Sequence, residues 1–229
     1  VVQINVEKGV QGGFSTAFRN VIGFFAHRDP EPMGLTLPDR QKGRKIVMNR
    51  IVPMFKETDV LAGLTTRKSA DLQAEQLRLI NGFIMHLMWS GSASSMASDP
   101  MRIAINDEVD KFPDWTGNDA DPISLTWKRL TTYQERKLQI NLSSPTTVYG
   151  KIHGLFQASD VQLYYFVPCP ECDEWQRLVF PQVKWSRKAA FEAEKARMRA
   201  VLRNALDGAE DELGPEDMDH QQLAALLEQ

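Results

Sequence analysis

The sequence predicts an α/β protein with a mainly parallel sheet that carries helices on both faces. Short segments rich in β-branched and aromatic residues alternate along the chain with longer segments of helical periodicity, which is the pattern of βαβ units. In addition, the apolar segment at residues 102–106 leads directly into three acids, Asp107, Glu108 and Asp110. Ligand sites of parallel sheets lie at the carboxyl ends of the strands, so these acids stand where a site is expected.

The individual elements follow from periodicity, because apolar runs predict strands and apolar residues repeated every three or four positions predict helices. The expected strands are residues 1–6, 33–37, 83–89, 102–106, 136–142 and 161–167. The expected helices are residues 16–26, 40–55, 122–133 and 188–206, with a shorter one within 217–228. Residues 72–79 fit either a helix or a polar connection. His86, inside an apolar segment, is expected to be a strand residue rather than a ligand.

The length of 229 residues and the hydrophobic content of 42% allow one α/β domain with some peripheral elaboration. The longest apolar runs are too short to span a membrane, and the N-terminus lacks the layout of a signal peptide, so we expect neither a membrane protein nor an exported one. Because the chain starts at Val1 without an initiator Met, we expect a fragment of a longer protein.

The net charge of −3 conceals an asymmetry along the chain. Residues 207–229 contain eight acids and no Lys or Arg, so residues 1–206 hold 27 basic and 22 acidic residues, a net charge of +5. Basic residues cluster within 40–50 and again within 184–203. Clusters of this kind are solvated helix faces or contacts to DNA, and charge alone leaves both interpretations open.

The acids after residues 102–106 indicate nucleotide chemistry. In P-loop hydrolases the first acid at such a strand end holds Mg²⁺ and the second orients and deprotonates the attacking water. This assigns Asp107 to the metal and Glu108 to the base. The alternative is an ordinary acidic turn at the surface.

A phosphate-binding loop should then follow an earlier strand, and residues 8–16 (KGVQGGFST) stand between the first expected strand and the first expected helix. The loop departs from the standard pattern, because Phe14 occupies the position of the usual lysine. Lys8 opens the loop and could reach the same phosphate oxygens from the other side, although a plain glycine-rich turn is the alternative. The expected phosphate-binding residues are Lys8, Gly9, Val10, Gln11, Gly12, Gly13, Phe14, Ser15 and Thr16, with the Ser15 hydroxyl joining Asp107 at Mg²⁺.

The order of the segments adds a family resemblance. After residues 8–16 come the small-residue segment 90–98, the acids, and then residues 119–123, Arg129, 136–137, 143–146 and 165–172 in a single line. This order resembles the ATPase domain of the large terminase subunit of lambda-like tailed bacteriophages, the GpA family, over about residues 1–185. Some members of that family also place the loop lysine at the start and an aromatic residue before the serine, so Lys8 with Phe14 is similar to a known departure.

The resemblance implies a fold, an activity and partners. It implies a three-layer, RecA-like P-loop NTPase of the additional-strand (ASCE) type over residues 1–185, and a helical acidic extension or linker over 186–229 that leads toward a missing nuclease domain. The implied activity is an ATP- and Mg²⁺-dependent motor that moves double-stranded DNA into a procapsid, without nuclease activity in this fragment. The implied partners are double-stranded DNA, the small terminase subunit and the portal. We expect a homo-oligomeric ring during packaging, or a monomer as an isolated domain, in the cytoplasm of the infected bacterial host.

Two further assignments concern hydrolysis. The resemblance implies that Ser143, Ser144 and Thr146 form the coupling motif that passes the γ-phosphate state to DNA-gripping parts, whereas without the resemblance they read as a Ser-Pro turn. Arg129 could stabilise γ-phosphate charge as a catalytic arginine finger does, or it could be a surface residue in an ion pair.

Cys169 and Cys172 form a Cys-x-x-Cys turn of the shape that binds zinc. Structural zinc takes four ligands, and these are the two cysteines of the chain. The resembled family has a second pair downstream, so zinc here would need His153 or His220 to complete the site. The alternatives are a reduced thiol pair and a disulfide.

Two other functions fit parts of the sequence. The stretch from Asp107 to Asp110 also matches the signature of DExD-type (superfamily 2) helicases, with residues 143–146 as their Ser/Thr motif, but nothing after Cys172 resembles the second RecA-like domain that a helicase needs. A catalytically silent assembly module is the other alternative, and it is favoured if Lys8 points away from the loop.

Overall fold

The computed structural model describes residues 2–9, 12–66, 68, 71–96, 99–114, 121–179 and 192–200. The chain divides into two compact units, Val1–Gln162 and Leu163–Gln229. The functional boundary expected at residue 185 stays a prediction. Within the described residues, no helix combines the length and the apolar character that crossing a bilayer requires.

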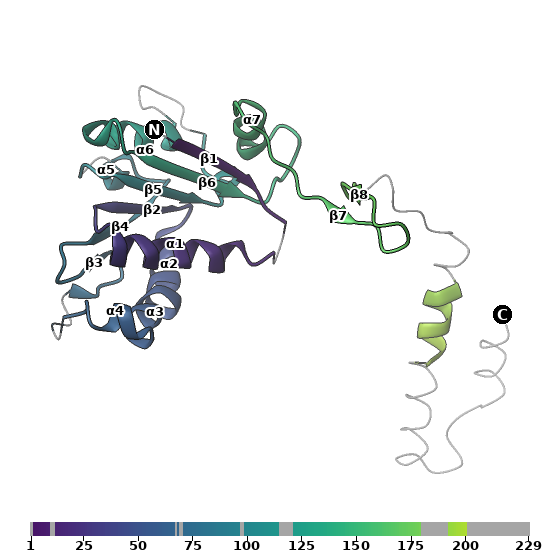
Figure 1. Ribbon diagram of the computed structural model, residues 1–229, viewed down its shortest axis with the longest axis horizontal. Helices are drawn as coiled ribbons and strands as arrows, with labels where there is room; N and C mark the ends of the chain where they lie inside the picture. The colour runs from purple at the N-terminus through teal and green to yellow at the C-terminus, as the bar shows by residue number, and fades with distance from the viewer. Residues whose placement is uncertain are drawn as a thin grey trace, which may run out of the picture. The chain divides into compact units, whose positions relative to one another are not determined.

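A six-stranded sheet forms the centre of the first unit (Figure 1). Its strands are β1 (Val2–Glu7), β2 (Met33–Leu37), β3 (Gln76–Arg78), β4 (Ile84–Trp89), β5 (Ile103–Asp107) and β6 (Leu138–Ser143). They lie in the order β1-β6-β5-β2-β4-β3, and all neighbours are parallel except β3 and β4. The strand β6 therefore separates the strand of the glycine-rich loop from the strand of the acids, as in the additional-strand P-loop fold. The predicted fold class is confirmed.

Helices and short helical turns connect the strands. They are α1 (Phe14–Arg28), α2 (Arg40–Ile46), the π-helical turn η1 (Val47–Ile51), α3 (Val52–Glu57), α4 (Asp59–Ala62), α5 (Ala93–Met96), the 3-10 turn η3 (Val109–Lys111), α6 (Pro122–Arg129), the 3-10 turn η4 (Thr131–Tyr133) and α7 (Lys151–Gln157). The helix expected at 40–55 forms as α2, η1 and α3 in direct succession. The helix expected at 122–133 ends earlier, at Arg129, and continues as η4.

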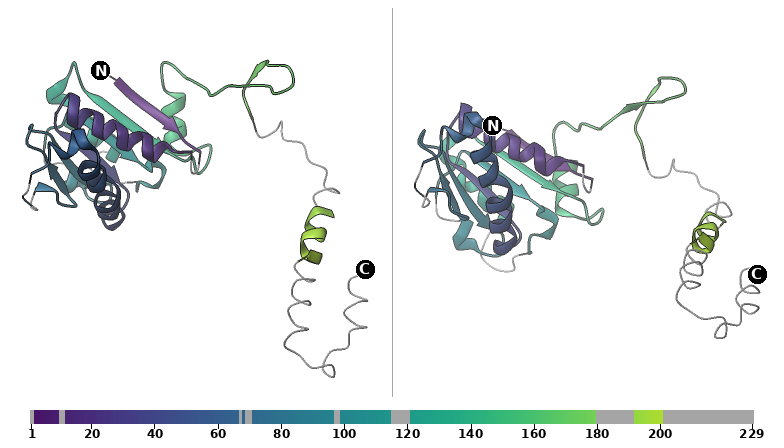
Figure 2. Two further views of the ribbon diagram at one scale, coloured as in Figure 1. Left: turned by 60° about the horizontal axis from the view of Figure 1, so that its bottom comes forward. Right: turned by 90° about the horizontal axis from the view of Figure 1, so that it is seen from below.

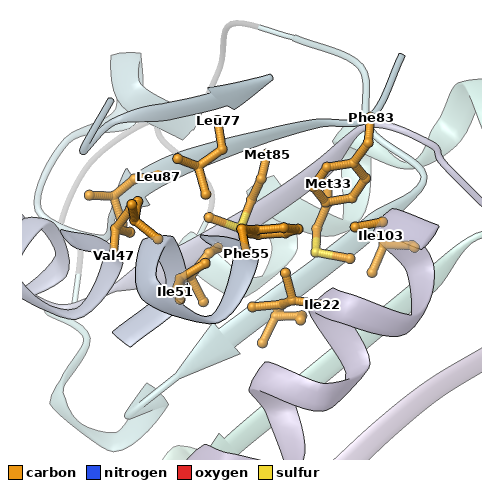
Figure 3. Close-up of a cluster of buried hydrophobic side chains, with 14 of the residues drawn as sticks. Ile22, Met33, Val47, Ile51, Phe55, Leu77, Phe83, Met85, Leu87 and Ile103 are labelled. Carbon is orange, nitrogen blue, oxygen red and sulfur yellow. The ribbon is translucent and has the colours of Figure 1, made fainter. Parts of the chain in front are cut away.

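The two faces of the sheet bury different clusters, because successive strand residues point to opposite faces. The larger cluster packs α1, η1 and α3 against one face (Figure 3). Its buried members include Ile22, Met33, Val47, Ile51, Phe55, Leu77, Phe83, Met85, Leu87 and Ile103. On the other face Ala104 of β5 packs with Met96 of α5 and with Leu130. Helices thus lie on both faces of the sheet, which gives the expected three layers (Figure 2).

A ladder of asparagine side chains crosses three strands on the face that carries α6. Asn141 of β6 donates to Asn5 of β1 at 2.9 Å, and Asn106 of β5 donates to Asn141 at 2.8 Å. Asn106 also donates to Thr126 of α6 at 3.0 Å, and Asn5 donates to the carbonyl of Leu155 in α7 at 3.2 Å. The ladder ties the three strands and two helices together directly beneath the ends of β5 and β6.

Two expectations about secondary structure differ from the structure. Residues 72–79 contain the short strand β3, which pairs antiparallel with β4, so they form neither a helix nor a wholly polar connection. Residues 161–166 are not a strand, and the side chains of Val161, Leu163 and Tyr165 are 72%, 82% and 85% exposed. Their β propensity is not realised because a strand needs a neighbour that supplies a ladder of hydrogen bonds.

The second unit begins with a small two-stranded ribbon. Its strands are β7 (Val167–Pro168) and β8 (Trp175–Gln176), which pair antiparallel. Residues 192–200 are helical, inside the helix expected at 188–206. The remainder of that helix, and the short helix expected within 217–228, lie outside the described residues.

Candidate functional site

The glycine-rich loop joins β1 to the N-terminus of α1. Gly13 caps that helix with φ of 78°, a left-handed conformation that glycine adopts without a Cβ penalty. Its carbonyl accepts the amides of Thr16 and Ala17 at 2.9 and 3.1 Å. The positive end of the α1 dipole therefore lies at the loop, where it favours an anion such as phosphate. Val10 and Gln11 lie outside the described residues, as does the side chain of Ser15.

The two predicted catalytic acids lie at the carboxyl end of β5. Asp107 is the last residue of the strand, and Glu108 follows with φ of 60°, a left-handed conformation that is rare for a residue with a side chain. The Glu108 amide donates to Oδ1 of Asp107 at 2.8 Å. Backbone strain of this kind often accompanies functional sites, because surrounding contacts must hold it in place.

Lys8 reaches Asp107 across the sheet. Its Nζ lies 2.6 Å from Oδ1 of Asp107, and both side chains are largely buried, with 11% and 18% exposed. The backbone amide of Lys8 donates to the carbonyl of Ser143 at 2.9 Å, which fixes the start of the loop against the end of β6. The lysine therefore points toward the acids, so the condition that favoured a silent module is not met.

Glu108 is held by two other lysines. Nζ of Lys42, in α2, lies 2.8 and 2.7 Å from its two carboxylate oxygens, and Nζ of Lys111 lies 3.3 Å from Oε2. Burial raises the pKa of Glu108, but the hydrogen bonds and charges of Lys42 and Lys111 outweigh burial, and the net effect lowers the pKa. The carboxyl group is thus kept ionised, as a general base must be before it accepts a proton.

A cavity of about 380 Å³ lies between the loop and the acids. Its lining includes Lys8, Gly9, Gly12, Gly13, Phe14, Thr16, Arg50, Glu108, Lys111, Ser143 and Ser144. Three of these side chains are cationic and one is anionic, so the cavity carries a net positive charge suited to phosphate groups. Most of the described residues of the predicted loop thus lie around the same cavity as the predicted base, Glu108, and two residues of the predicted coupling motif.

The predicted coupling residues leave the end of β6, with Ser143 inside the strand rather than after it. Thr146 is held by Asp110, whose Oδ2 accepts the Thr146 amide at 2.9 Å and the Thr146 hydroxyl at 3.1 Å. Oδ1 of Asp110 accepts the amide of Ile152, in α7, at 2.8 Å. The Asp110 amide in turn donates to the Ser143 hydroxyl at 3.3 Å. Asp110 therefore connects the acidic segment to both the predicted coupling residues and α7.

The residues present fit a magnesium ion. Carboxylate, hydroxyl and water oxygens are the ligands that Mg²⁺ prefers. Asp107 takes part in hydrogen bonds with the described residues through Oδ1, which leaves Oδ2 available for a metal or a metal-bound water. The donor set at the end of β5 therefore suits the ion that the sequence predicts.

Arg129 does not reach this cavity. It is the last residue of α6, where its Nε donates to the carbonyl of Met96 at 3.2 Å and its own carbonyl accepts the amide of Met101. Met101 precedes β5, so Arg129 lies at the opposite end of that strand from Asp107. The structure does not support a catalytic contact of Arg129 within its own chain.

The Cys-x-x-Cys turn forms a tight loop in the second unit. The Cys169 amide donates to the carbonyl of Glu174, and the Cys169 carbonyl accepts the amide of Asp173, both at 2.9 Å. Hydrogen bonds from the amides of Glu171 and Cys172 lower the pKa of the Cys169 thiol. Both cysteines are free thiols, and the described part of the chain contains no group of three or more His, Cys, Asp or Glu placed to hold a metal. Nδ1 of His153 lies 2.7 Å from Oε1 of Glu7, and His220 is outside the described residues.

The basic cluster within residues 40–50 serves several purposes. Arg40 and Arg44 pair with Glu75 at 2.7 and 3.7 Å, whereas Lys42 pairs with Glu108 and Arg50 lines the cavity. Sequence reasoning did not assign Lys42 or Arg50 to the site. Their place in the chain could have indicated this, because both residues follow β2. Since β2 pairs in parallel with β5, the segment after β2 begins at the same edge of the sheet as the acids.

Comparison with known proteins supports the same conclusion. The family model for the phage terminase large subunit gpA, ATPase domain, matches residues 1–200. A comparison with curated proteins found no match. The ATPase domain of the large terminase of Thermus phage P74-26 is 13% identical, with a TM-score of 0.50 over 77% of this chain and 71% of that chain.

Two further solved structures are similar. A mutant of the same Thermus phage domain is 15% identical, with a TM-score of 0.49 and the same coverage. The bacteriophage Phi-29 viral genome packaging motor assembly is 14% identical, with a TM-score of 0.47 over 77% of this chain and 54% of that chain. At these identities the likeness concerns the fold. The family match decides against the helicase alternative: the chain belongs to the gpA family of phage terminase large subunits and comprises the ATPase domain of a DNA-packaging terminase.

Proposed function

We propose that the first unit hydrolyses ATP in the presence of Mg²⁺ and uses the reaction to translocate double-stranded DNA. The observation that carries this proposal is the arrangement around the 380 Å³ cavity, where Lys8 and the α1 N-terminus face Glu108 and Ser143. A cationic loop, a base and a small hydroxyl residue at one edge of a parallel sheet are the parts that phosphoryl transfer to water requires.

Each residue has a distinct role in the proposal. Lys8 and the loop amides bind the phosphates, and Mg²⁺ held by Asp107 and the Ser15 hydroxyl would neutralise phosphate charge. Glu108 accepts a proton from the attacking water while the bond between the γ-phosphorus and the ADP oxygen breaks. Ser143, Ser144 and Thr146 then transmit the loss of the γ-phosphate to the parts that grip DNA, through Asp110 and α7.

The partners follow from the packaging role. We propose that the chain acts as part of a homo-oligomeric ring at the portal of a procapsid, together with the small terminase subunit, in the cytoplasm of the infected bacterium. The isolated domain is expected to be a monomer without nuclease activity. Zinc binding by the thiol pair stays a prediction that needs further ligands.

The test is phosphate release by the full chain with ATP and Mg²⁺, measured with and without double-stranded DNA. Glu108→Gln should preserve ATP binding and lower turnover roughly 100-fold or more, because the amide cannot accept the proton. Glu57→Gln, an exposed acid at the end of α3, is the matched control and should leave turnover unchanged. A Glu108→Gln variant that keeps wild-type turnover, or a wild-type chain that binds no ATP, would contradict the proposal.

A further inference from the structure

The cationic side chains that line the 380 Å³ cavity differ in their partners. They are Lys8, Lys111 and Arg50. Nζ of Lys8 lies 2.6 Å from Oδ1 of Asp107, and Nζ of Lys111 lies 3.3 Å from Oε2 of Glu108. Within the part of the chain that the structure describes, the Arg50 side chain forms neither a hydrogen bond nor an ion pair. The positive charge that this cavity can offer to an incoming anion therefore comes mainly from Arg50.

The predicted phosphate loop contributes a single charge of its own. Residues 8–16 contain Lys8 and no other charged residue. Phosphoryl transfer places negative charge on the γ-phosphate oxygens, and in many P-loop hydrolases an arginine neutralises part of it. Arg129 does not take this role in its own chain, because it lies at the opposite end of β5 from Asp107. A second source of positive charge must therefore come from elsewhere if one subunit is to hydrolyse ATP by itself.

The π-helical turn η1 holds the backbone around Arg50. In this turn the Val52 amide donates to the Val47 carbonyl, five residues back. Pro53 follows and has no amide hydrogen to continue the regular helical ladder. Val47 and Ile51 are buried in the core, whereas Arg50 between them is exposed. The packing thus fixes the turn and leaves the guanidinium group available to a ligand, and π-helical turns are frequent at functional sites.

Arg50 adjoins both predicted catalytic acids. It lines the larger cavity together with Glu108, and it lines a smaller cavity of about 50 Å³ together with Asp107. In the proposed reaction Glu108 holds the attacking water and Asp107 holds Mg²⁺, so the terminal phosphate must lie close to both acids. Arg19 also lines the smaller cavity, but its Nη2 donates to the Thr16 hydroxyl at 2.9 Å. Arg50 is therefore the arginine that is best placed for the γ-phosphate.

We infer that Arg50 is a catalytic residue: its guanidinium group binds the γ-phosphate oxygens from within the same chain and neutralises the charge that develops on them during hydrolysis. Arg50 gains and loses no proton in this role, because a guanidinium group acts by charge and by its two parallel N–H donors. One subunit then needs no arginine from a neighbour to hydrolyse ATP. The inference rests on the proposed function, because it requires that the cavity bind and hydrolyse ATP.

The first experiment measures phosphate release by the full chain with ATP and Mg²⁺, and ADP affinity by calorimetry. Arg50→Ala should lower kcat roughly 100-fold or more and change ADP affinity by less than about twofold, because the contact is made to the γ-phosphate. Arg50→Lys should recover a small part of the loss, because an ammonium group lacks the planar pair of donors. Arg28→Ala, an exposed arginine at the end of α1, is the matched control and should change neither quantity. An unchanged kcat in Arg50→Ala would overturn the inference.

A second experiment separates this role of the guanidinium group from a structural one. Aluminium fluoride bound beside ADP mimics the phosphoryl group during transfer, so the wild-type chain should bind ADP more tightly in its presence. Arg50→Ala should lose most of this gain, whereas Arg28→Ala should keep it. Guanidinium chloride, well below denaturing concentrations, should restore part of the turnover of Arg50→Ala.

The outcomes distinguish the inference from the function on which it rests. An Arg50→Ala variant that keeps the full gain from aluminium fluoride would overturn the role of Arg50 while leaving ATP hydrolysis by the chain intact. A wild-type chain that binds no nucleotide would instead overturn the proposed function, and the inference with it.

Discussion

Asp110 and Thr146, which are 36 positions apart in the sequence, meet through two hydrogen bonds to one carboxylate oxygen. The other oxygen of Asp110 binds the amide of Ile152 near the start of α7. Gly150 allows this approach, because a Cβ at that position would collide with the Asp110 carboxylate. A single side chain thus determines where the turn after β6 and the following helix lie.

Replacing Asp110 should loosen that turn. Asp110→Asn removes the charge that strengthens the bonds to Thr146 and Ile152, and we expect a loss of about 1–3 kcal/mol in the free energy of unfolding. Urea denaturation measures the loss, and amide hydrogen exchange should accelerate at both partner residues. Asp160→Asn, an exposed acid, should leave both measurements unchanged. Unchanged exchange at Ile152 in Asp110→Asn would contradict this role.

The displaced loop lysine can be tested against the aromatic residue that stands in its usual position. Lys8→Ala should weaken nucleotide binding more than Phe14→Tyr, because the Lys8 ammonium group faces the cavity whereas the Phe14 ring carries no charge. A charge-assisted bond to phosphate is worth about 1.5–3 kcal/mol, which corresponds to a loss of roughly tenfold or more. A nucleotide titration that finds equal effects would count against Lys8 as the phosphate-binding lysine.

The asparagine ladder should contribute to stability through its central member. Asn141→Ala removes the acceptor of Asn106 and the donor to Asn5, so the buried Asn106 amide and the half-buried Asn5 amide each lose a partner. A buried polar group without a partner costs about 1–3 kcal/mol, so the free energy of unfolding should fall by at least that amount. Gln3→Ala is the control. It removes one hydrogen bond, from the exposed Gln3 of β1 to Gln139 of β6, and should therefore lower the free energy of unfolding less. Equal losses for the two variants would argue against a special role of the ladder.

Replacing Gly34 or Gly154 with alanine should change the stability of the protein in opposite directions. A Cβ at Gly34 in β2 would lie 2.5 Å from Sδ of Met101 and would also crowd Met88, so Gly34→Ala should destabilise the protein by about 1–3 kcal/mol. A Cβ at Gly154, in α7, meets no atom within 4 Å, and alanine there should stabilise the helix by about 0.5–1 kcal/mol. Thermal denaturation of both variants checks the signs, and a stabilising Gly34→Ala would show that the methionines repack freely.

Stability should depend on pH through His86. Burial lowers the pKa of His86, an effect partly opposed by Asp99 and reinforced by Arg78. Because the unfolded chain binds the proton more readily, the contribution of His86 to stability is complete above the unfolded pKa of about 6.5 and is lost as the pH falls below it. His86→Gln should therefore show a smaller fall in the free energy of unfolding between pH 7.5 and 5.5 than the wild type. An identical fall in both proteins would exclude His86 as a contributor.

The sequence predicted correctly those features that depend only on residues close together in the chain. The apolar run before Asp107 forms β5, and the glycines after Lys8 form a loop that leads into α1. His86 lies in β4, as predicted. These features depend on local periodicity and on residues that need a particular backbone conformation, such as Gly13.

The remaining features depend on contacts between distant segments. Residues 161–166 have the composition of a strand but pair with no strand in the described part of the chain, whereas β3 forms in a less apolar segment because β4 offers it an edge. Arg129 stands in the expected order of motifs along the sequence. It nevertheless lies near the start of β5, at the opposite end of that strand from Asp107. Lys42 carries no motif and becomes part of the site through the parallel pairing of β2 with β5. Pairing of this kind cannot be read from local periodicity.

The asparagine ladder has a mechanical consequence. Since Asn5, Asn141 and Asn106 bond across β1, β6 and β5, sliding one of these strands past another would break buried hydrogen bonds. We therefore expect the strands that bear the predicted phosphate loop, the predicted coupling residues and the acids to move together. A conformational change driven by the nucleotide is then expected beyond the strand ends, in the side chains there and in the turn that leads to α7.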